Sequence, residues 1–461
     1  MIKYKDKTEF VNKRLVMFSV WSAVGWLLIV ATFGFLTSLK FIWPDFLGGH
    51  YSTAWGPLRI SHVNGVIFAW WTTSAMAVSF YIVPRLTGRK LWAEPLAWAS
   101  IVGWNIAWAI AVLSMLLGYN QGIELGEAVW PVDVIVALPV VALCFVVIGT
   151  VLTREENKIY VSLWYLMAAV VWTALNWMLG NFGMGFFAAG ANSADLHGFY
   201  LHNLVGLTIT PMGVAMAYYF LPAAANKPLF SHKLSLIGFW TIAFIYPFSG
   251  AHHYIFTPIS HWVQTVAIAF SIMLIIPVTT VVFNLFATMK GAWPKMIGSA
   301  PLKYLIVGNF FYMAVCFQGP LQALRTVQTA THYSDWVIAH SHMAILSTFT
   351  FWSFAAFFFM WPRITGKEIN QKLANAQFWV ALIGAVIMIS SLTAGGLLQA
   401  GLWRNASVPF IETVQRMVPY WSIRSFSGVM LLTAFVMFAY ILWDARKPLA
   451  EEVKEVLDGG E

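Results

Sequence analysis

Apolar segments of about twenty residues or more recur along the whole chain, and each is long enough to cross a lipid bilayer as a helix. Of the 461 residues, 59% are hydrophobic and only 10% are charged. This composition indicates an all-α, polytopic membrane protein, because a spanning helix satisfies its own backbone hydrogen bonds. The sequence predicts twelve spanning helices, at residues 15–41, 59–86, 91–119, 131–153, 159–188, 197–221, 233–257, 261–287, 302–327, 335–362, 375–400 and 421–444.

The connections between these segments are short, so one integral domain is expected to fill residues 15–444. A short N-terminal segment, residues 1–14, precedes it, and a charged tail, residues 445–461, follows it. The N-terminal segment, the even-numbered loops and the tail carry 21 of the 27 Lys and Arg residues, which predicts that both termini are cytoplasmic. The net charge of +8 does not indicate nucleic-acid binding, since the basic residues lie in short loops without interleaved aromatic residues.

Six histidines fall within two or three turns of the outer face in this arrangement, and spans of both chain directions contribute them. They are His62, His202, His252, His253, His340 and His342. Ionisable residues inside a membrane are usually functional, although each histidine alone has the alternative of being a buried hydrogen-bonding side chain. Only Cys144 and Cys316 are available as thiols, and both lie in apolar segments, so a metal here is expected to be held by histidine.

His340 and His342 are spaced i, i+2, which places them about 200° apart around a helix. Each is therefore a candidate axial ligand of a different haem, since neutral imidazole is a good ligand for haem iron and for copper. His62 is a candidate for the second axial ligand of one of these haems, which would leave the other haem with an open face.

His202, His252 and His253 are candidates for a copper site that faces the open iron. Adjacent residues are about 100° apart on a helix, so the His252–His253 pair can converge on one ion near a helix end. Tyr246 precedes His253 by seven residues, about 20° short of two full turns, and is expected on the same helix face. A phenol there would supply a proton and an electron to a bound oxidant; the alternative is an ordinary interfacial tyrosine.

Further polar residues have two interpretations each. Arg59 and Arg424 are candidates to pair with haem propionates, or else they extend to the membrane surface. Glu124 and Glu127 precede Trp130 in an outer loop and are candidates to bind a cation such as calcium, or else they are solvated. Nearer the cytoplasm, a polar proton path is expected from Ser235, His232 and Tyr218, the last two of which have the alternative of being interfacial.

Several motifs together resemble the catalytic subunit of C-family haem–copper oxygen reductases, the cbb3-type cytochrome c oxidases. The similarity covers nearly all twelve spans and is carried by GPLRISHVNGVIFAWW, FYLHNLVGL, FIYPFSGAHHYIFT, WVQTVAIAFSIMLIIP, THYSDWVIAHSHMAIL and the Trp130–Asp133 turn. The resemblance implies a twelve-helix haem–copper oxidase bundle in a bacterial inner membrane. It implies that His62 and His342 bind a low-spin haem b, that His340 binds a high-spin haem b3, and that the other three histidines bind the copper, CuB.

The same resemblance implies that Tyr246 is covalently linked to the copper ligand His202. Two positions depart from the family pattern. Gln318 stands where these oxidases have a glutamate near the proximal side of the high-spin haem. His232 stands where the proton channel usually has a tyrosine, so both departures concern the proton route.

The expected activity is the four-electron reduction of O2 to water, coupled to proton uptake and translocation. The sequence has no CxxCH motif, so the electrons are expected to come through separate partner subunits. The resemblance implies that these partners are membrane-anchored c-type cytochrome subunits. The nearest alternative is a nitric oxide reductase with non-haem iron in place of copper, against which Tyr246 and Gln318 both argue. A transporter or structural subunit without a redox centre is the other alternative, and it requires all six histidines to be incidental.

Overall fold

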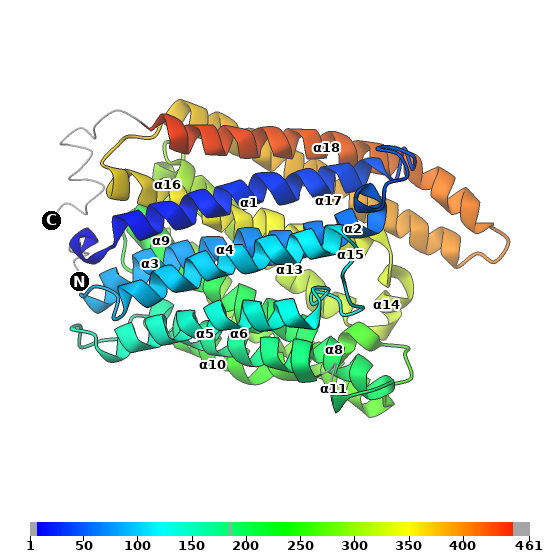
Figure 1. Ribbon diagram of the computed structural model, residues 1–461, viewed down its shortest axis with the longest axis horizontal. Coiled ribbons are helices and arrows are strands. Elements are labelled where there is room, and N and C mark those ends of the chain that lie inside the picture. The colour runs from blue at the N-terminus through cyan, green and yellow to red at the C-terminus, as the bar shows by residue number, and fades with distance from the viewer. Residues whose placement is uncertain (1–6, 184–186, 446–461) are drawn as a thin grey trace.

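The computed structural model describes residues 7–183 and 187–445, which form a bundle of roughly parallel helices (Figure 1). Within these residues, twelve helical segments are long and apolar enough to cross a membrane, which confirms the predicted all-α, multi-pass fold. They are α1 (Lys13–Leu39), α2–η3–α3 (Trp55–Thr87), α4 (Glu94–Leu116), α5 (Trp130–Leu152), α6–η4 (Val161–Gly183), α8–η5–α9 (Ala191–Ala225), α10–η6–η7 (His232–Tyr254), α11–α12 (His261–Thr288), α13 (Ala300–Gln322), α15–η9–α16 (Asp335–Thr365), α17 (Gln371–Trp403) and α18 (Phe410–Asp444).

The two terminal segments of the prediction lie partly outside this description, since residues 1–6 and 446–461 are not included. Residues 184–186, near the end of the fifth predicted span, are also outside it. The described chain nevertheless places the start of α1 and the end of α18 at one end of the bundle (Figure 1). The opposite end, where α2, α8 and α15 begin, is called the histidine end below.

Three spans form the centre of the bundle. In the most apolar stretch of α2–η3–α3 and of α8–η5–α9, 94% of the residues are buried, and in α15–η9–α16 the fraction is 78%. The other nine spans bury 39–56% of the corresponding stretch, as expected for helices with one face toward lipid. Both environments are apolar, so hydropathy alone does not separate the central spans from the outer ones.

Each central span contains a π-helical segment shortly after a histidine. These segments are η3 (Gly65–Thr72) after His62, η5 (Leu204–Ile209) after His202, and η9 (Ile345–Thr350) after His342. A π-helix within an α-helix changes the rotation between the two flanking halves and is frequent at functional sites. All three central spans therefore change their helical rotation next to a candidate ligand.

Glycines let several helices approach the central spans closely. A Cβ added at Gly396 of α17 would lie 2.1 Å from the backbone nitrogen of Trp336, at the start of α15. A Cβ at Gly65 would lie 2.3 Å from the Val30 side chain of α1. Small residues at such crossings are typical of membrane helix packing.

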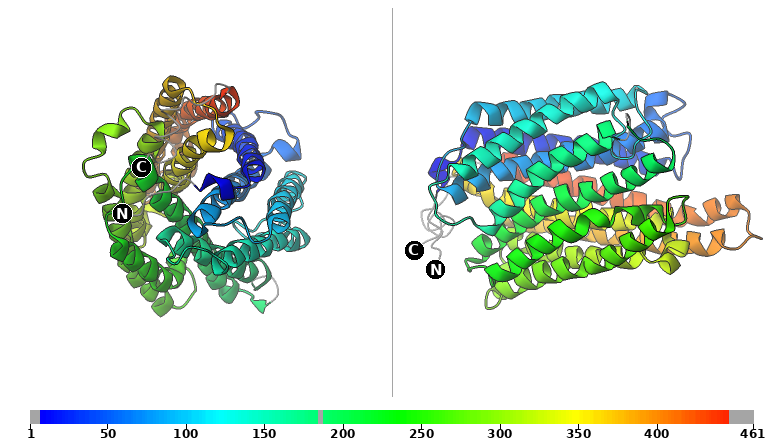
Figure 2. Two further views of the ribbon diagram at one scale, coloured as in Figure 1. Left: turned by 90° about the vertical axis from the view of Figure 1, so that its left-hand side faces the viewer. Right: turned by 90° about the horizontal axis from the view of Figure 1, so that it is seen from below.

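The last span begins earlier than predicted, at Phe410 instead of residue 421, and α17 ends later, at Trp403. The added turns of α18 include a polar stretch in which Glu412 and Arg416 form an i, i+4 ion pair, and this stretch lowers the local hydropathy. Pro419 lies inside α18 without ending it. The α17–α18 hairpin consequently projects beyond the other helices at the histidine end (Figures 1 and 2).

Candidate metal and haem centre

Three histidine rings from two distant segments meet at the histidine end. His202 lies near the end of α8 (Ala191–Asn203), and His252 and His253 lie in η7 (Gly250–Tyr254). One ring nitrogen or the other of each histidine lies within 4.8 Å of those of the other two. The structure thus brings together the three predicted copper ligands, and in the described residues no second group of three or more His, Cys, Asp or Glu side chains is arranged in this way.

Hydrogen bonds fix the orientation of these rings. The Oγ of Ser271 on α11 (His261–Met273) donates to the Ala267 carbonyl at 2.6 Å, so it accepts from Nδ1–H of His252, which is 2.5 Å away. The Nε2 of His252 then carries the free lone pair. The Nε2 of His202 is buried and has no hydrogen-bond partner. No protein group competes for this nitrogen, so it is available to bind a metal.

Tyr246 contacts this cluster through a geometry that differs from the prediction. The expectation that Tyr246 and His253 share a face of one regular helix is wrong, because α10 ends at Ile245 and two 3-10 turns, η6 (Tyr246–Phe248) and η7, follow. Pro247 lacks the backbone N–H that a continued helix uses. The Tyr246 ring instead stacks on His202, with ring centroids 4.2 Å apart and planes 23° apart.

Gly206 in η5 makes room for this tyrosine. A Cβ added there would lie 1.8 Å from a ring carbon of Tyr246, so no larger residue fits without moving the ring. The π-helical turn after His202 therefore carries the backbone surface against which Tyr246 packs. Sequence reasoning missed Gly206 and Ser271, although both lie within motifs that carry the resemblance, because only the fold places them beside Tyr246 and His252.

The remaining three histidines each use Nδ1 for a protein hydrogen bond. His62 is 2.7 Å from the Val30 carbonyl, His342 is 2.8 Å from the Ile338 carbonyl, and His340 is 2.8 Å from Gln318 Oε1. A carbonyl accepts from Nδ1–H, which leaves Nε2 free to bind a metal.

These rings divide into two groups by their neighbours. His340 lies near His252 and His253, whereas His342 lies near His62. This agrees with the prediction that His340 and His342 face different sites. The lack of space at Gly34 of α1, where a Cβ would lie 2.4 Å from the His62 ring, shows how closely α1 supports that ring.

The two arginines and two glutamates lie near the same end. Arg59 forms an ion pair with Glu124 at 3.3 Å, and both side chains are partly exposed. The Arg424 guanidinium lies 5.1 Å from the centre of the Phe41 ring and is half-buried. Glu127 is only 6% exposed and accepts a hydrogen bond from Asn64 at 2.7 Å, so it is not solvated. Burial raises the pKa of the Glu127 carboxyl, which the Asn64 hydrogen bond partly opposes.

The polar path predicted toward the other end of the bundle is present only as neighbouring residues. The Ser235 hydroxyl donates to the His232 carbonyl at 2.7 Å within its own helix. The His232 ring stacks on Tyr160, whose hydroxyl donates to the Tyr218 carbonyl at 2.7 Å. The three residues therefore lie near one another, while no direct side-chain hydrogen bond among them is present.

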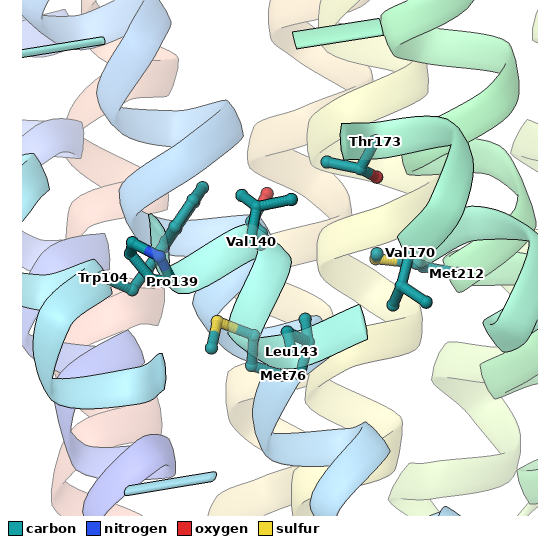
Figure 3. A pocket seen from close by; sticks show the side chains of 9 residues that line it. Met76, Trp104, Pro139, Val140, Leu143, Val170, Thr173 and Met212 are labelled. Carbon is teal, nitrogen blue, oxygen red and sulfur yellow. The ribbon is translucent and has the colours of Figure 1, made fainter. Parts of the chain in front are cut away.

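An apolar cavity lies elsewhere in the bundle, between α3 (Thr73–Thr87), α4, α5, α6 (Val161–Trp177) and α9 (Thr210–Ala225) (Figure 3). Its lining is Thr72, Met76, Trp104, Pro139, Val140, Leu143, Val170, Thr173 and Met212. None of these side chains is a histidine, cysteine or carboxylate, so this cavity is separate from the histidine centre.

Comparisons with known proteins agree with this arrangement. The family model described as cytochrome c and quinol oxidase polypeptide I matches residues 14–430. The cbb3-type cytochrome c oxidase subunit CcoN1 of Stutzerimonas stutzeri is 31% identical over 95% of this chain and 96% of its own length. A cytochrome c oxidase subunit 1 homolog of Agrobacterium tumefaciens is 31% identical over 94% of this chain and 83% of its own.

A solved structure of a haem–copper terminal oxidase dimer has the same fold, with a TM-score of 0.78 over 95% of this chain and 85% of that chain at 16% identity. The predicted class of enzyme, an oxidoreductase of the cytochrome c oxidase type, is confirmed by the family match. The chain therefore belongs to the cytochrome c and quinol oxidase polypeptide I family, and its predicted resemblance to the catalytic subunit of cbb3-type haem–copper oxidases is confirmed.

Proposed function

We propose that this chain reduces O2 to water at a centre in which His202, His252 and His253 hold copper. His340 binds the neighbouring high-spin haem b3, and His62 and His342 bind the low-spin haem b. The observation that carries this proposal is the convergence of three histidines, with an unpartnered His202 Nε2 and a His252 ring fixed by Ser271. When bound, the copper and the high-spin haem iron would supply redox chemistry at this centre.

The protein side chains perform the remaining tasks. The Tyr246 phenol stacks on a copper ligand and is placed to give a proton and an electron to the bound oxidant. Its covalent link to His202 is part of this proposal. Arg59 and Arg424 are the proposed partners of the haem propionates, and their positions near His62 and at the start of the apolar part of α18 support that role.

Electrons arrive from membrane-anchored c-type cytochrome subunits on the outer side, and protons arrive from the cytoplasm and are translocated in part. The relative named CcoN1 supports this, because it belongs to a cbb3-type cytochrome c oxidase. A calcium ion at Glu124 and Glu127 would have to compete with their present partners, since Glu124 pairs with Arg59 and Glu127 accepts from Asn64.

The first test is a joint measurement of copper, iron, calcium and haem b in the purified protein. We expect about one copper and about two haems per chain, with no iron beyond the haem iron. A third, non-haem iron without copper would overturn the proposal in favour of nitric oxide reduction. The absence of a carboxylate from the three-histidine group, among the described residues, favours copper.

The role of Tyr246 is tested by Tyr246→Phe. This variant keeps the ring that packs against Gly206 but removes the hydroxyl. We expect unchanged copper and haem content with a loss of O2 reduction of at least about a hundredfold, the usual scale for a general acid. Retained activity would contradict the proposed role, and Tyr254→Phe is the matched control because its hydroxyl bonds His197 instead.

A further inference from the structure

His340 is held through its Nδ1 by a side chain from another helix. Gln318 of α13 places its Oε1 2.8 Å from that nitrogen. If His340 binds iron through Nε2, as proposed above, then Nδ1 carries the hydrogen and the amide oxygen of Gln318 accepts it. The acceptor is a neutral amide, so no negative charge lies next to the ring at this position.

The ring has little freedom to choose another partner. Trp336, one helical turn earlier on α15, lies nearly parallel to the His340 ring, with centroids 6.2 Å apart and planes 7° apart. A Cβ at Gly319 would be in ordinary contact with the ring, 3.7 Å from His340 Cε1. The α13 backbone and the indole thus support the ring while Gln318 accepts its N–H.

We infer that Gln318 is a positioning residue that sets the basicity of His340 and, through it, the reduction potential of the high-spin haem. A carboxylate that accepts from Nδ1–H pulls the proton and gives the imidazole more anionic character, which strengthens the iron–histidine bond and favours the oxidised iron. A neutral amide draws the proton away from the ring much less than a carboxylate does, because hydrogen bonds to charged groups are about twice as strong as those to neutral groups. Gln318 therefore keeps His340 a neutral ligand and favours the reduced iron. This inference rests on the proposed haem assignment of His340.

The experiment compares three variants in the purified, haem-loaded protein. Gln318→Glu keeps the acceptor and adds charge, and Gln318→Met keeps the length but removes the acceptor. Gln322→Glu adds the same charge one turn later on the same helix, and no hydrogen bond joins Gln322 to His340, so it controls for charge alone. The measurements are the iron–histidine stretching frequency of the ferrous high-spin haem by resonance Raman spectroscopy and its midpoint potential by redox titration.

We expect Gln318→Glu to raise the stretching frequency and to lower the midpoint potential, changing the ratio of reduced to oxidised haem at a fixed potential by about fivefold to tenfold. Gln318→Met is expected to lower the stretching frequency, and Gln322→Glu is expected to leave it unchanged. An unchanged frequency in both Gln318 variants overturns the inference. If Gln318→Glu does not assemble, Gln318→Met alone still decides it.

A separate variant tests whether His340 is the ligand of the high-spin haem. His340→Ala must remove the high-spin haem while it retains the low-spin haem. If His340→Ala keeps the high-spin signal, the proposed function is wrong at this residue, whatever the Gln318 variants show.

Discussion

At the scale of single residues, the candidate ligands are oriented by atoms that come from other parts of the chain. Val30 of α1, Ser271 of α11 and Gln318 of α13 each bond one histidine Nδ1. Such partners fix which ring nitrogen faces the metal, and their loss typically lowers metal affinity about 10-fold to 100-fold. Glycines near the rings also contribute to the orientation of the ligands, because they provide the space in which each ring lies.

Gly34→Ala is expected to displace the His62 ring. The added Cβ would lie 2.4 Å from Cε1 of that ring, whose Nδ1 is already held by Val30. We predict a loss of more than about half of the low-spin haem, measured from the absorption spectrum and the haem content, given that overpacking costs about 1–3 kcal/mol. Gly25→Ala on the same helix meets nothing within 4 Å and is the control. Equal haem content in the two variants would contradict the prediction.

The Glu127 carboxyl, in the loop before α5, is expected to make the stability of the folded protein depend on pH. Burial raises its pKa above the ordinary value of 4.5, so the folded protein holds this proton at pH values where the unfolded chain has released it. Folding therefore loses stability as the pH rises from about that ordinary value through the raised pKa. Glu127→Gln removes the ionisation and keeps an acceptor for Asn64. We expect this variant to gain stability over the unchanged protein as the pH rises.

The measurement is thermal unfolding in detergent at several pH values, with a chelator present so that bound cations do not contribute. Glu124→Gln is the matched control. Glu124 is exposed, and its replacement removes only a surface ion pair worth about 0–1 kcal/mol. If Glu127→Gln shows no advantage at high pH, the carboxyl is not buried in the way described.

At the scale of helices, the two histidines of α15 (Asp335–Ala344) depend on how this helix packs on α17. Gly396→Ala is expected to displace the start of α15, since its Cβ would lie 2.1 Å from a backbone atom of Trp336. A backbone cannot rotate away as a side chain can, so we predict a destabilisation of about 1–3 kcal/mol and a change in both haem signals.

Gly401→Ala on the same helix is the control, because nothing lies within 4 Å of the added methyl group. It is expected to be neutral or stabilising by up to about 1 kcal/mol, as alanine favours helix. Thermal unfolding and the haem absorption bands measure both effects. A Gly396→Ala protein that matches the control would show that α15 is not fixed by this crossing.

The helices were predictable from the sequence because each span is a continuous apolar segment, and all twelve were found in order. The start of α18 was not, since the Glu412–Arg416 turn is helical but polar. The six histidines were predicted as ligands because they share one depth in the bundle, and their roles as ligands stay a prediction. Tyr246 was proposed from a helix that in fact ends at Ile245. Gly34, Gly206 and Ser271 were missed because their contacts join segments far apart in sequence.

At the scale of the whole molecule, the even number of spans places the start of α1 and the end of α18 at one end of the bundle (Figure 1). The distribution of basic residues predicts that this end is cytoplasmic. It also predicts that the projecting α17–α18 hairpin is on the outer side, where the proposed cytochrome partners deliver electrons.

This orientation is tested with single cysteines in loops at the two ends. Glu156 follows α5 at the predicted cytoplasmic end, and Ser407 lies between α17 and α18 at the histidine end; both residues are in described loops. A maleimide that does not cross membranes is expected to label Ser407→Cys on the intact outer face, and Glu156→Cys only after the membrane is opened. The reverse pattern would invert the assigned direction of electron and proton delivery.

The π-helical segments of the three central spans have a consequence for how such a chain can change over generations. Each π-helical segment divides its span into two parts. One part is apolar and packs tightly against neighbouring helices, and the other part carries a candidate ligand. One residue corresponds to about 100° of rotation, so gaining or losing a residue there would turn a ligand without repacking the apolar half. In each central span, the rotation of the half that carries the ligand is therefore separate from the rotation of the half that packs in the core.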